Sequence, residues 1–127
     1  MELPITSLLT GAAAILLVLL SFPIANHRRK NQLSSGDGGD DKFNRMIRAQ
    51  ANFTEYVPIG LIAIGLTEMG GGAQMTVCGL AAMLAVGRLL HPFGLIANQL
   101  WARALGLILT LLALLGAGAR LLYAALV

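Results

Sequence analysis

Four long apolar runs, separated by short polar links, are the feature that most constrains how this 127-residue chain can fold. Each run approaches or exceeds the roughly 20 residues that a helix needs to cross a bilayer. Hydrophobic residues make up 57% of the chain and charged residues only 12%, which is about half the share typical of soluble domains. The sequence therefore predicts a small integral membrane protein. It argues against a soluble fold, a disordered chain and a DNA-binding module.

The apolar runs predict helices rather than strands. Leu, Ala, Ile and Val dominate them without the strict alternation that a membrane β-barrel requires. We expect four transmembrane helices in one domain over residues 1–127, with approximate bounds 3–25, 41–69, 73–97 and 100–126. The first run lacks the basic start and cleavage pattern of a signal peptide, so we interpret it as a retained helix. Asp40 or Asp41 is expected to cap the second helix. The predicted fold is an all-α membrane four-helix bundle.

Basic residues predict how the bundle lies in the membrane. Six of the nine Lys and Arg residues fall between positions 28 and 48, around the first link, and the second link has none. Loops rich in Lys and Arg stay on the cytoplasmic side of a membrane. We therefore expect the first and third links to be cytoplasmic and both termini to lie on the opposite side.

A polar stripe on the second helix is the most informative motif. Asn52, Glu55 and Tyr56 lie four, seven and eight residues after Arg48. These spacings place a cation, an amide, an anion and a phenol on one helical face. Arg45 extends this polar stripe backwards. A charge at the bilayer centre costs about 2.5–3.5 kcal/mol, so Glu55 is expected to face a partner helix or a polar cavity and to pair with a cation. Such groups are functional-site candidates by default, and a structural polar zipper between helices is the alternative.

The residue types in the polar stripe restrict the ligand. Arginine binds carboxylates through two parallel hydrogen bonds, and a glutamate accepts hydrogen bonds from an ammonium group. The surrounding apolar walls suit a second, lipophilic molecule. Glutathione together with a lipophilic electrophile fits this description, as do other anionic amphiphiles. The sequence contains no metal-ligand cluster and no nucleotide-binding fingerprint.

Residues 48–58, which read R-A-Q-A-N-F-T-E-Y-V-P, resemble the helix-two signature of the MAPEG family, the membrane-associated proteins in eicosanoid and glutathione metabolism. The resemblance covers nearly the whole chain. It includes the basic end of the first helix at 27–29, the Gly/Asp loop at 36–39 and the segment 87–91 late in the third helix. The compact form is similar to the bacterial branch. The resemblance implies a homotrimer in a bacterial inner membrane, with glutathione bound between neighbouring subunits near the cytoplasmic side.

Carried over residue by residue, the resemblance also implies roles for individual positions. Glutathione contacts fall at Arg28, Arg48, Gln50, Asn52, Glu55, Tyr56, Arg88 and His91. Arg103, early in the fourth helix, matches the family's catalytic arginine, whose charge favours the nucleophilic thiolate of glutathione over the thiol. Snorkelling of Arg103 to the membrane interface is the structural alternative.

Two functions are therefore expected from the sequence. The first is a glutathione-dependent transferase or peroxidase that activates the glutathione thiol for attack on a lipophilic electrophile. The alternative is a non-catalytic member that binds glutathione or lipid, which Leu95 favours because many glutathione-using members have Tyr there. A small transporter is a third interpretation. Proton-coupled exporters of this size place an acidic residue inside the first helix, and here only Glu2 lies at its tip.

Overall fold

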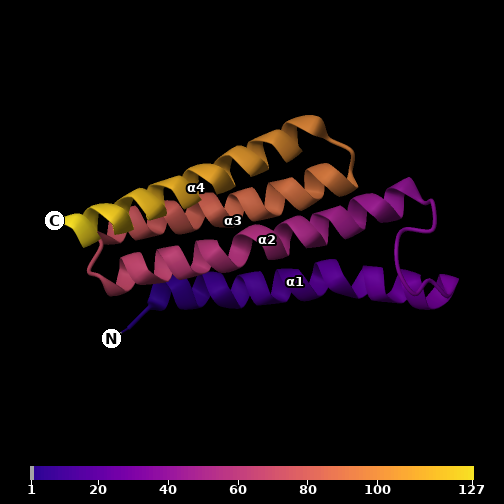
Figure 1. Cartoon of the computed structure of the whole chain (residues 1–127), viewed down its shortest axis with the longest axis horizontal. Coiled ribbons are helices and arrows are strands. Elements are labelled where there is room, and N and C mark those ends of the chain that lie inside the picture. Colours follow the sequence, from indigo (N-terminus) through magenta and orange to yellow (C-terminus); the bar gives the residue numbers. More distant parts are fainter. Residues whose placement is uncertain (1) are drawn as a thin grey trace.

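The computed structural model describes residues 2–127, which form four helices and no strand. The helices are α1 (Pro4–Asn31), α2 (Asp41–Met69), α3 (Gln74–Ile96) and α4 (Leu100–Leu126). Figure 1 shows them side by side as an antiparallel bundle. Both termini and the α2–α3 turn lie at one end, and the α1–α2 loop and the α3–α4 turn lie at the other, which we call the polar end. The predicted all-α four-helix bundle is confirmed.

Three of the helices, α1, α3 and α4, are long and apolar enough to cross a membrane. α2 is not among them, because the polar stripe occupies its first half; it packs against α1, α3 and α4. Many large apolar side chains point outward, among them Leu8, Phe22 and Leu115, which are 78%, 70% and 69% exposed. Soluble monomers rarely expose so much contiguous apolar surface. These side chains are therefore expected to face lipid.

α1 continues beyond its predicted end near residue 25 and reaches Asn31. The basic residues that follow the predicted bound form the last turn of this helix: Arg28, Arg29 and Lys30. Arginine and lysine are good helix formers, and cations at a helix C-terminus interact favourably with its negative end. Gln32 ends the helix in a left-handed conformation, with its N–H bonded to carbonyl oxygens of the last turn.

Two carboxylates cap helices. Asp40 accepts a hydrogen bond from the backbone N–H of Phe43 at 3.1 Å, which confirms the predicted aspartate cap of α2. This bond is the largest of the contributions that hold the pKa of Asp40 below its usual value. Glu68, in the last turn of α2, accepts from the backbone N–H groups of Ile5 and Thr6 at 3.0 and 2.9 Å. α2 therefore supplies the N-terminal cap that α1 does not provide for itself.

α3 and α4 touch through their backbones at three glycines, which we call the glycine seam: Gly87, Gly94 and Gly106. A Cβ atom on Gly106 would lie 2.5 Å from the backbone nitrogen of His91, and one on Gly87 would lie 2.8 Å from the carbonyl oxygen of Gly106. A Cβ atom on Gly94 would overlap the backbone of Arg103. The glycine seam therefore fixes which side chains of α4 lie beside α3.

The apolar core fills the half of the bundle away from the polar end. It is a cluster of small and branched side chains from α2, α3 and α4: Ala63, Ile64, Val77, Leu80, Ala81, Leu84, Ala113 and Ala117. Beyond this cluster, toward the polar end, the buried positions of α3 include Arg88 and His91. The fold thus separates a half with an apolar core cluster from a half that buries Arg88 and His91.

The substitution Gly106→Ala is expected to destabilise the fold by about 1–3 kcal/mol, the usual cost of overpacking. The added methyl group would meet the α3 backbone, which cannot rotate away as a side chain does. Gly118→Ala on the same helix is the matched control, since nothing lies within 4 Å of its Cβ position and alanine is the better helix former. Thermal unfolding in one detergent compares the two variants, and equal losses would contradict the glycine seam.

Candidate functional site

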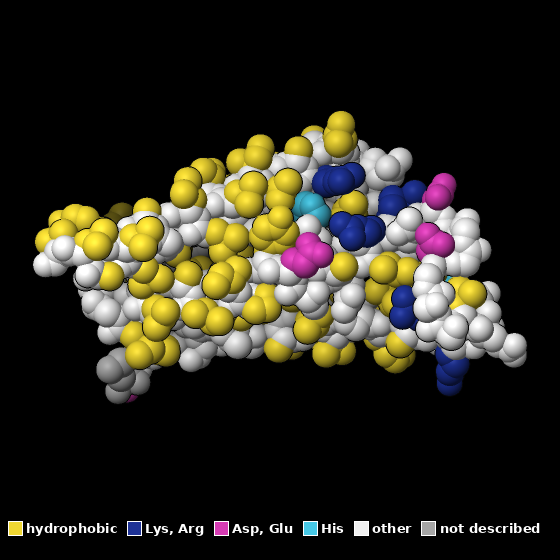
Figure 2. Space-filling view, in the orientation of Figure 1, with side chains coloured by type: hydrophobic (Ala, Val, Ile, Leu, Met, Phe, Trp, Pro, Cys, Tyr) yellow, Lys and Arg dark blue, Asp and Glu magenta, His cyan; other side chains and the backbone are white. Residues whose placement is uncertain are grey.

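A polar pocket of about 200 Å³ opens between α2, α3 and α4 at the polar end. Seven residues line it: Asn44, Arg45, Arg48, Asn52, His91, Leu95 and Arg103. Figure 2 shows basic side chains, a histidine and a neighbouring acidic side chain over this part of the molecule, whereas apolar side chains cover much of the rest of the same face. No acidic residue belongs to the lining. The polar pocket is therefore suited to anionic groups.

Four of the predicted site residues converge in the polar pocket. Arg48 and Asn52 come from α2, one helical turn apart, and so point to the same side. His91 comes from α3 and Arg103 from α4. In the glycine seam, Gly106 lies against the backbone of His91 and Gly94 against the backbone of Arg103. The seam therefore positions these two side chains relative to each other. His91 is 5% exposed, and its Nδ1 atom has no hydrogen-bond partner among residues 2–127.

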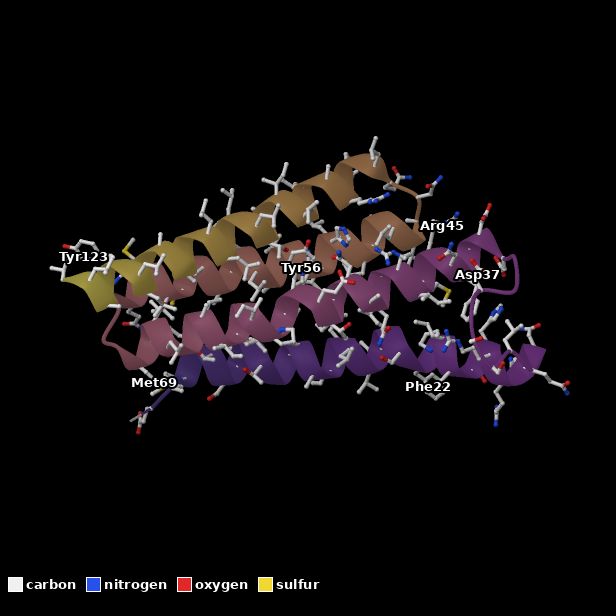
Figure 3. The ribbon with its side chains drawn as sticks, in the orientation of Figure 1. Phe22, Asp37, Arg45, Tyr56, Met69 and Tyr123 are labelled. Carbon is white, nitrogen blue, oxygen red and sulfur yellow. The ribbon has the colours of Figure 1, made fainter. Side chains whose placement is uncertain are left out.

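Arg88 lies behind the polar pocket rather than in its lining. It is 3% exposed, and its Nη1 atom donates to the side-chain oxygen of Asn52 at 2.9 Å and to the backbone oxygen of the same residue at 3.4 Å. Its guanidinium carbon lies 5.5 Å from the centre of the Tyr56 ring, a favourable place for a cation. Figure 3 shows Tyr56 between α2 and α3. Because Arg88 occupies the amide oxygen of Asn52, the amide nitrogen is left to donate to a ligand.

Arg88 also carries a charge that the chain leaves uncompensated. Its Nε and Nη2 atoms are buried without a hydrogen-bond partner in the described chain, and its side-chain hydrogen bonds go only to Asn52. Burying a cation costs free energy unless an anion or enough acceptors surround it. The positive charge behind the polar pocket therefore adds to its preference for anions.

The remaining predicted residues lie outside the lining. Arg28 is in the last turn of α1, and neither Gln50 nor Glu55 contributes to the polar pocket. Glu55 is exposed and takes part in none of the side-chain hydrogen bonds among residues 2–127, so the cation pairing that we predicted for it does not form within this chain. The side chain of Arg88 forms its hydrogen bonds with Asn52 instead. Arg48 lies seven positions before Glu55, which separates the two residues by about 10 Å along the helix axis.

Two polar residues of the lining, Asn44 and Arg45, were not among the predicted site residues. Arg45 belongs to the polar stripe, and Figure 3 shows it on α2 near the polar end. Asn44 precedes Arg48 and Asn52 at intervals of four residues, and this spacing places all three on one helical face. The signal was therefore present in the sequence for both residues.

Comparisons with known proteins agree with the family resemblance. The model of the MAPEG family matches residues 6–123. Two curated relatives, each called "Inner membrane protein YecN", come from Escherichia coli strain K12 and from Escherichia coli O6:H1. Each is 32% identical to this chain over 92 residues, which are 71% of this chain and 69% of the relative.

The uncompensated charge of Arg88 leads to a stability prediction. Arg88→Met keeps an unbranched side chain of similar length but removes the buried cation, so without ligand this variant is expected to be at least as stable as the wild type. Arg29→Met, at an exposed position, is the control. Thermal unfolding without glutathione measures the effect. A loss of about 3–5 kcal/mol, the cost of breaking a buried ion pair, would mean that Arg88 is already paired with an anion.

Proposed function

Since this chain belongs to the MAPEG family, the membrane-associated proteins in eicosanoid and glutathione metabolism, we propose that it is a membrane-bound, glutathione-dependent transferase or peroxidase. Its proposed location is a bacterial inner membrane, supported by the three apolar helices and by the name of its relatives. The observation that carries the function is the convergence of Arg48, Asn52 and Arg103 on one polar pocket without an acidic residue in its lining.

The groups of glutathione match the residues of the proposed site. Glutathione has two carboxylates, one ammonium group and one thiol. Arg48 suits a carboxylate, the amide nitrogen of Asn52 adds a hydrogen bond to it, and Glu55 suits the ammonium group. The other residues in the proposed glutathione site are those that the family resemblance names: Arg28, Gln50, Tyr56, Arg88 and His91. Arg88 acts there through its hydrogen bond to Asn52.

A site shared between subunits accounts for the residues that lie apart in one chain. Glu55 is exposed and has no side-chain hydrogen-bond partner among residues 2–127, and Arg28 lies outside the polar pocket. In the proposed homotrimer, glutathione lies between neighbouring subunits, so that α1 of one subunit and α2 of the next both contact it. The exposed apolar side chains then divide between subunit contacts and lipid.

The proposed catalytic residue is Arg103. A guanidinium beside the sulfur favours thiolate over thiol, because an opposite charge stabilises the ionised form. The thiol proton passes to solvent, the sulfur forms a bond to the electrophilic carbon, and the leaving group departs with the electrons of the broken bond. With a lipid hydroperoxide, two glutathione molecules are oxidised to the disulfide while the hydroperoxide is reduced to an alcohol and water. The lipophilic acceptor reaches the site from the bilayer.

Leu95 supports a second candidate, a non-catalytic member that binds glutathione or lipid. Leu95 lines the polar pocket, and its aliphatic side chain offers no hydroxyl to hydrogen-bond a sulfur. Under this candidate the polar pocket binds glutathione without activating its thiol, or it binds a lipid.

Bound glutathione is expected to ionise below the ordinary thiol pKa of about 8.5. Titration of the purified protein with glutathione, followed by thiolate absorbance at about 240 nm, measures the ionisation of the bound thiol. Arg103→Ala should raise the ionisation midpoint by about one to three pH units, because a neighbouring arginine lowers an acidic pKa by that much. Arg29→Ala, an exposed arginine in α1, should leave it unchanged. A folded wild type that binds glutathione without forming thiolate would favour the second candidate.

Glutathione affinity is expected to depend on Arg48. Arg48→Met should weaken binding by about 10- to 100-fold, the usual effect of removing a hydrogen bond to a charged group, with Arg29→Met as the control. Equilibrium dialysis with labelled glutathione measures the affinity. Equal affinities of wild type and Arg48→Met would count against the proposed transferase or peroxidase and against a non-catalytic member that binds glutathione.

A further inference from the structure

Arg45 is the guanidinium in the polar pocket for which the proposed function has no role. Its side chain is half-buried, and its Nε atom is buried without a hydrogen-bond partner among the described residues. Arg45 also lines a second, adjoining cavity of about 100 Å³, which we call the turn cavity. The lining of the turn cavity is Arg45, Gly94, Leu95, Asn98, Leu100 and Arg103.

The α3–α4 turn builds the turn cavity. The backbone N–H of Gln99 donates to the carbonyl oxygen of Gly94 at 2.8 Å, and Asn98 adopts a left-handed conformation with φ 56°. The close contact between Gly94 and the backbone of Arg103 brings the start of α4 against the end of α3. As a result, Arg103 borders both the polar pocket and the turn cavity.

Matching the charged groups of glutathione to the charged residues of the proposed site leaves Arg45 without a partner. Activated glutathione has two carboxylates, a thiolate and one ammonium group. In the proposed site Arg28 and Arg48 face the carboxylates, Arg103 faces the thiolate and Glu55 faces the ammonium group. Arg88 is bonded to Asn52. Arg45 is then left without an anion, and no acidic residue lines either cavity.

A partly buried guanidinium without a counter-charge favours an anion from outside the chain. We propose that the turn cavity is the acceptor subsite, where Arg45 and Asn98 bind a carboxylate carried by the electrophile. This inference rests on the proposed function and specifies its acceptor class. Leu95 and Leu100 contact the apolar body of the acceptor, its reactive carbon lies near Arg103, and its anionic group lies at the polar end. The acceptor is thus an anionic amphiphile rather than a neutral lipid.

A matched pair of acceptors tests the proposal. In 4-chloro-3,5-dinitrobenzoate and its primary amide, the thiolate sulfur bonds to the same ring carbon and chloride leaves, so the two compounds differ in charge. The measured quantity is the ratio of kcat/KM for the carboxylate to kcat/KM for the amide. Arg45→Gln is expected to lower this ratio by about 10- to 100-fold, and Arg29→Gln should keep the wild-type ratio. An unchanged ratio in Arg45→Gln would overturn the proposal.

Direct binding separates this inference from the proposed function. The compound 3,5-dinitrobenzoate has no leaving group, and equilibrium dialysis measures its affinity without any turnover. If neither acceptor is conjugated, the proposed enzyme activity fails, yet binding of 3,5-dinitrobenzoate that is lost in Arg45→Gln still supports the anion subsite. Equal binding to both proteins, or none to the wild type, would overturn it. If Arg45→Gln does not fold, Asn98→Ala replaces it, with a smaller loss expected in the same direction.

Discussion

The close backbone contact between α3 and α4 is the interaction on which the site depends. Between membrane helices, association rests on packing rather than on the hydrophobic effect, so small residues decide how closely two helices approach. Here Gly94 and Gly106 let α4 touch α3 beside Arg103 and His91. Rotating α4 by one residue would turn its side chains by about 100° and remove Arg103 from the polar pocket. The glycine seam therefore links the packing of the bundle to the chemistry proposed for it.

The second organising feature is the unequal distribution of charge along the bundle. The apolar cluster around Ile64 and Leu84 packs one half of the bundle, where Glu68 also caps α1. The other half collects guanidinium groups around the polar pocket and buries Arg88, whose side-chain hydrogen bonds within residues 2–127 go to Asn52. Such an arrangement costs stability in the free protein, and the packing of the apolar half offsets this cost. As a result, the positive charges of the polar pocket are in place before an anionic ligand binds. Binding and activation of a thiolate require such preorganised charges.

Much of the fold could be predicted, since apolar runs of membrane-spanning length with short links permit little besides a bundle. The polar stripe likewise identified Arg48 and Asn52 from helical spacing alone. Spacing along one helix cannot, however, tell what a side chain meets on another helix. For that reason three features were not predictable: the position of Arg88 behind the polar pocket, the lack of a hydrogen-bond partner for Glu55 within residues 2–127, and the cap that Glu68 provides for α1. All three depend on how helices far apart in sequence are rotated against each other.

The proposed chemistry requires the polar pocket to bind glutathione with its thiol beside Arg103. The most direct test is an experimental structure of the full assembly in a lipid nanodisc with glutathione bound, at a resolution that shows side chains. We expect a glutathione carboxylate on Arg48 and the sulfur within hydrogen-bonding distance of the Arg103 guanidinium. Glutathione bound elsewhere, or bound in the polar pocket with its sulfur pointing away from Arg103, would contradict this expectation.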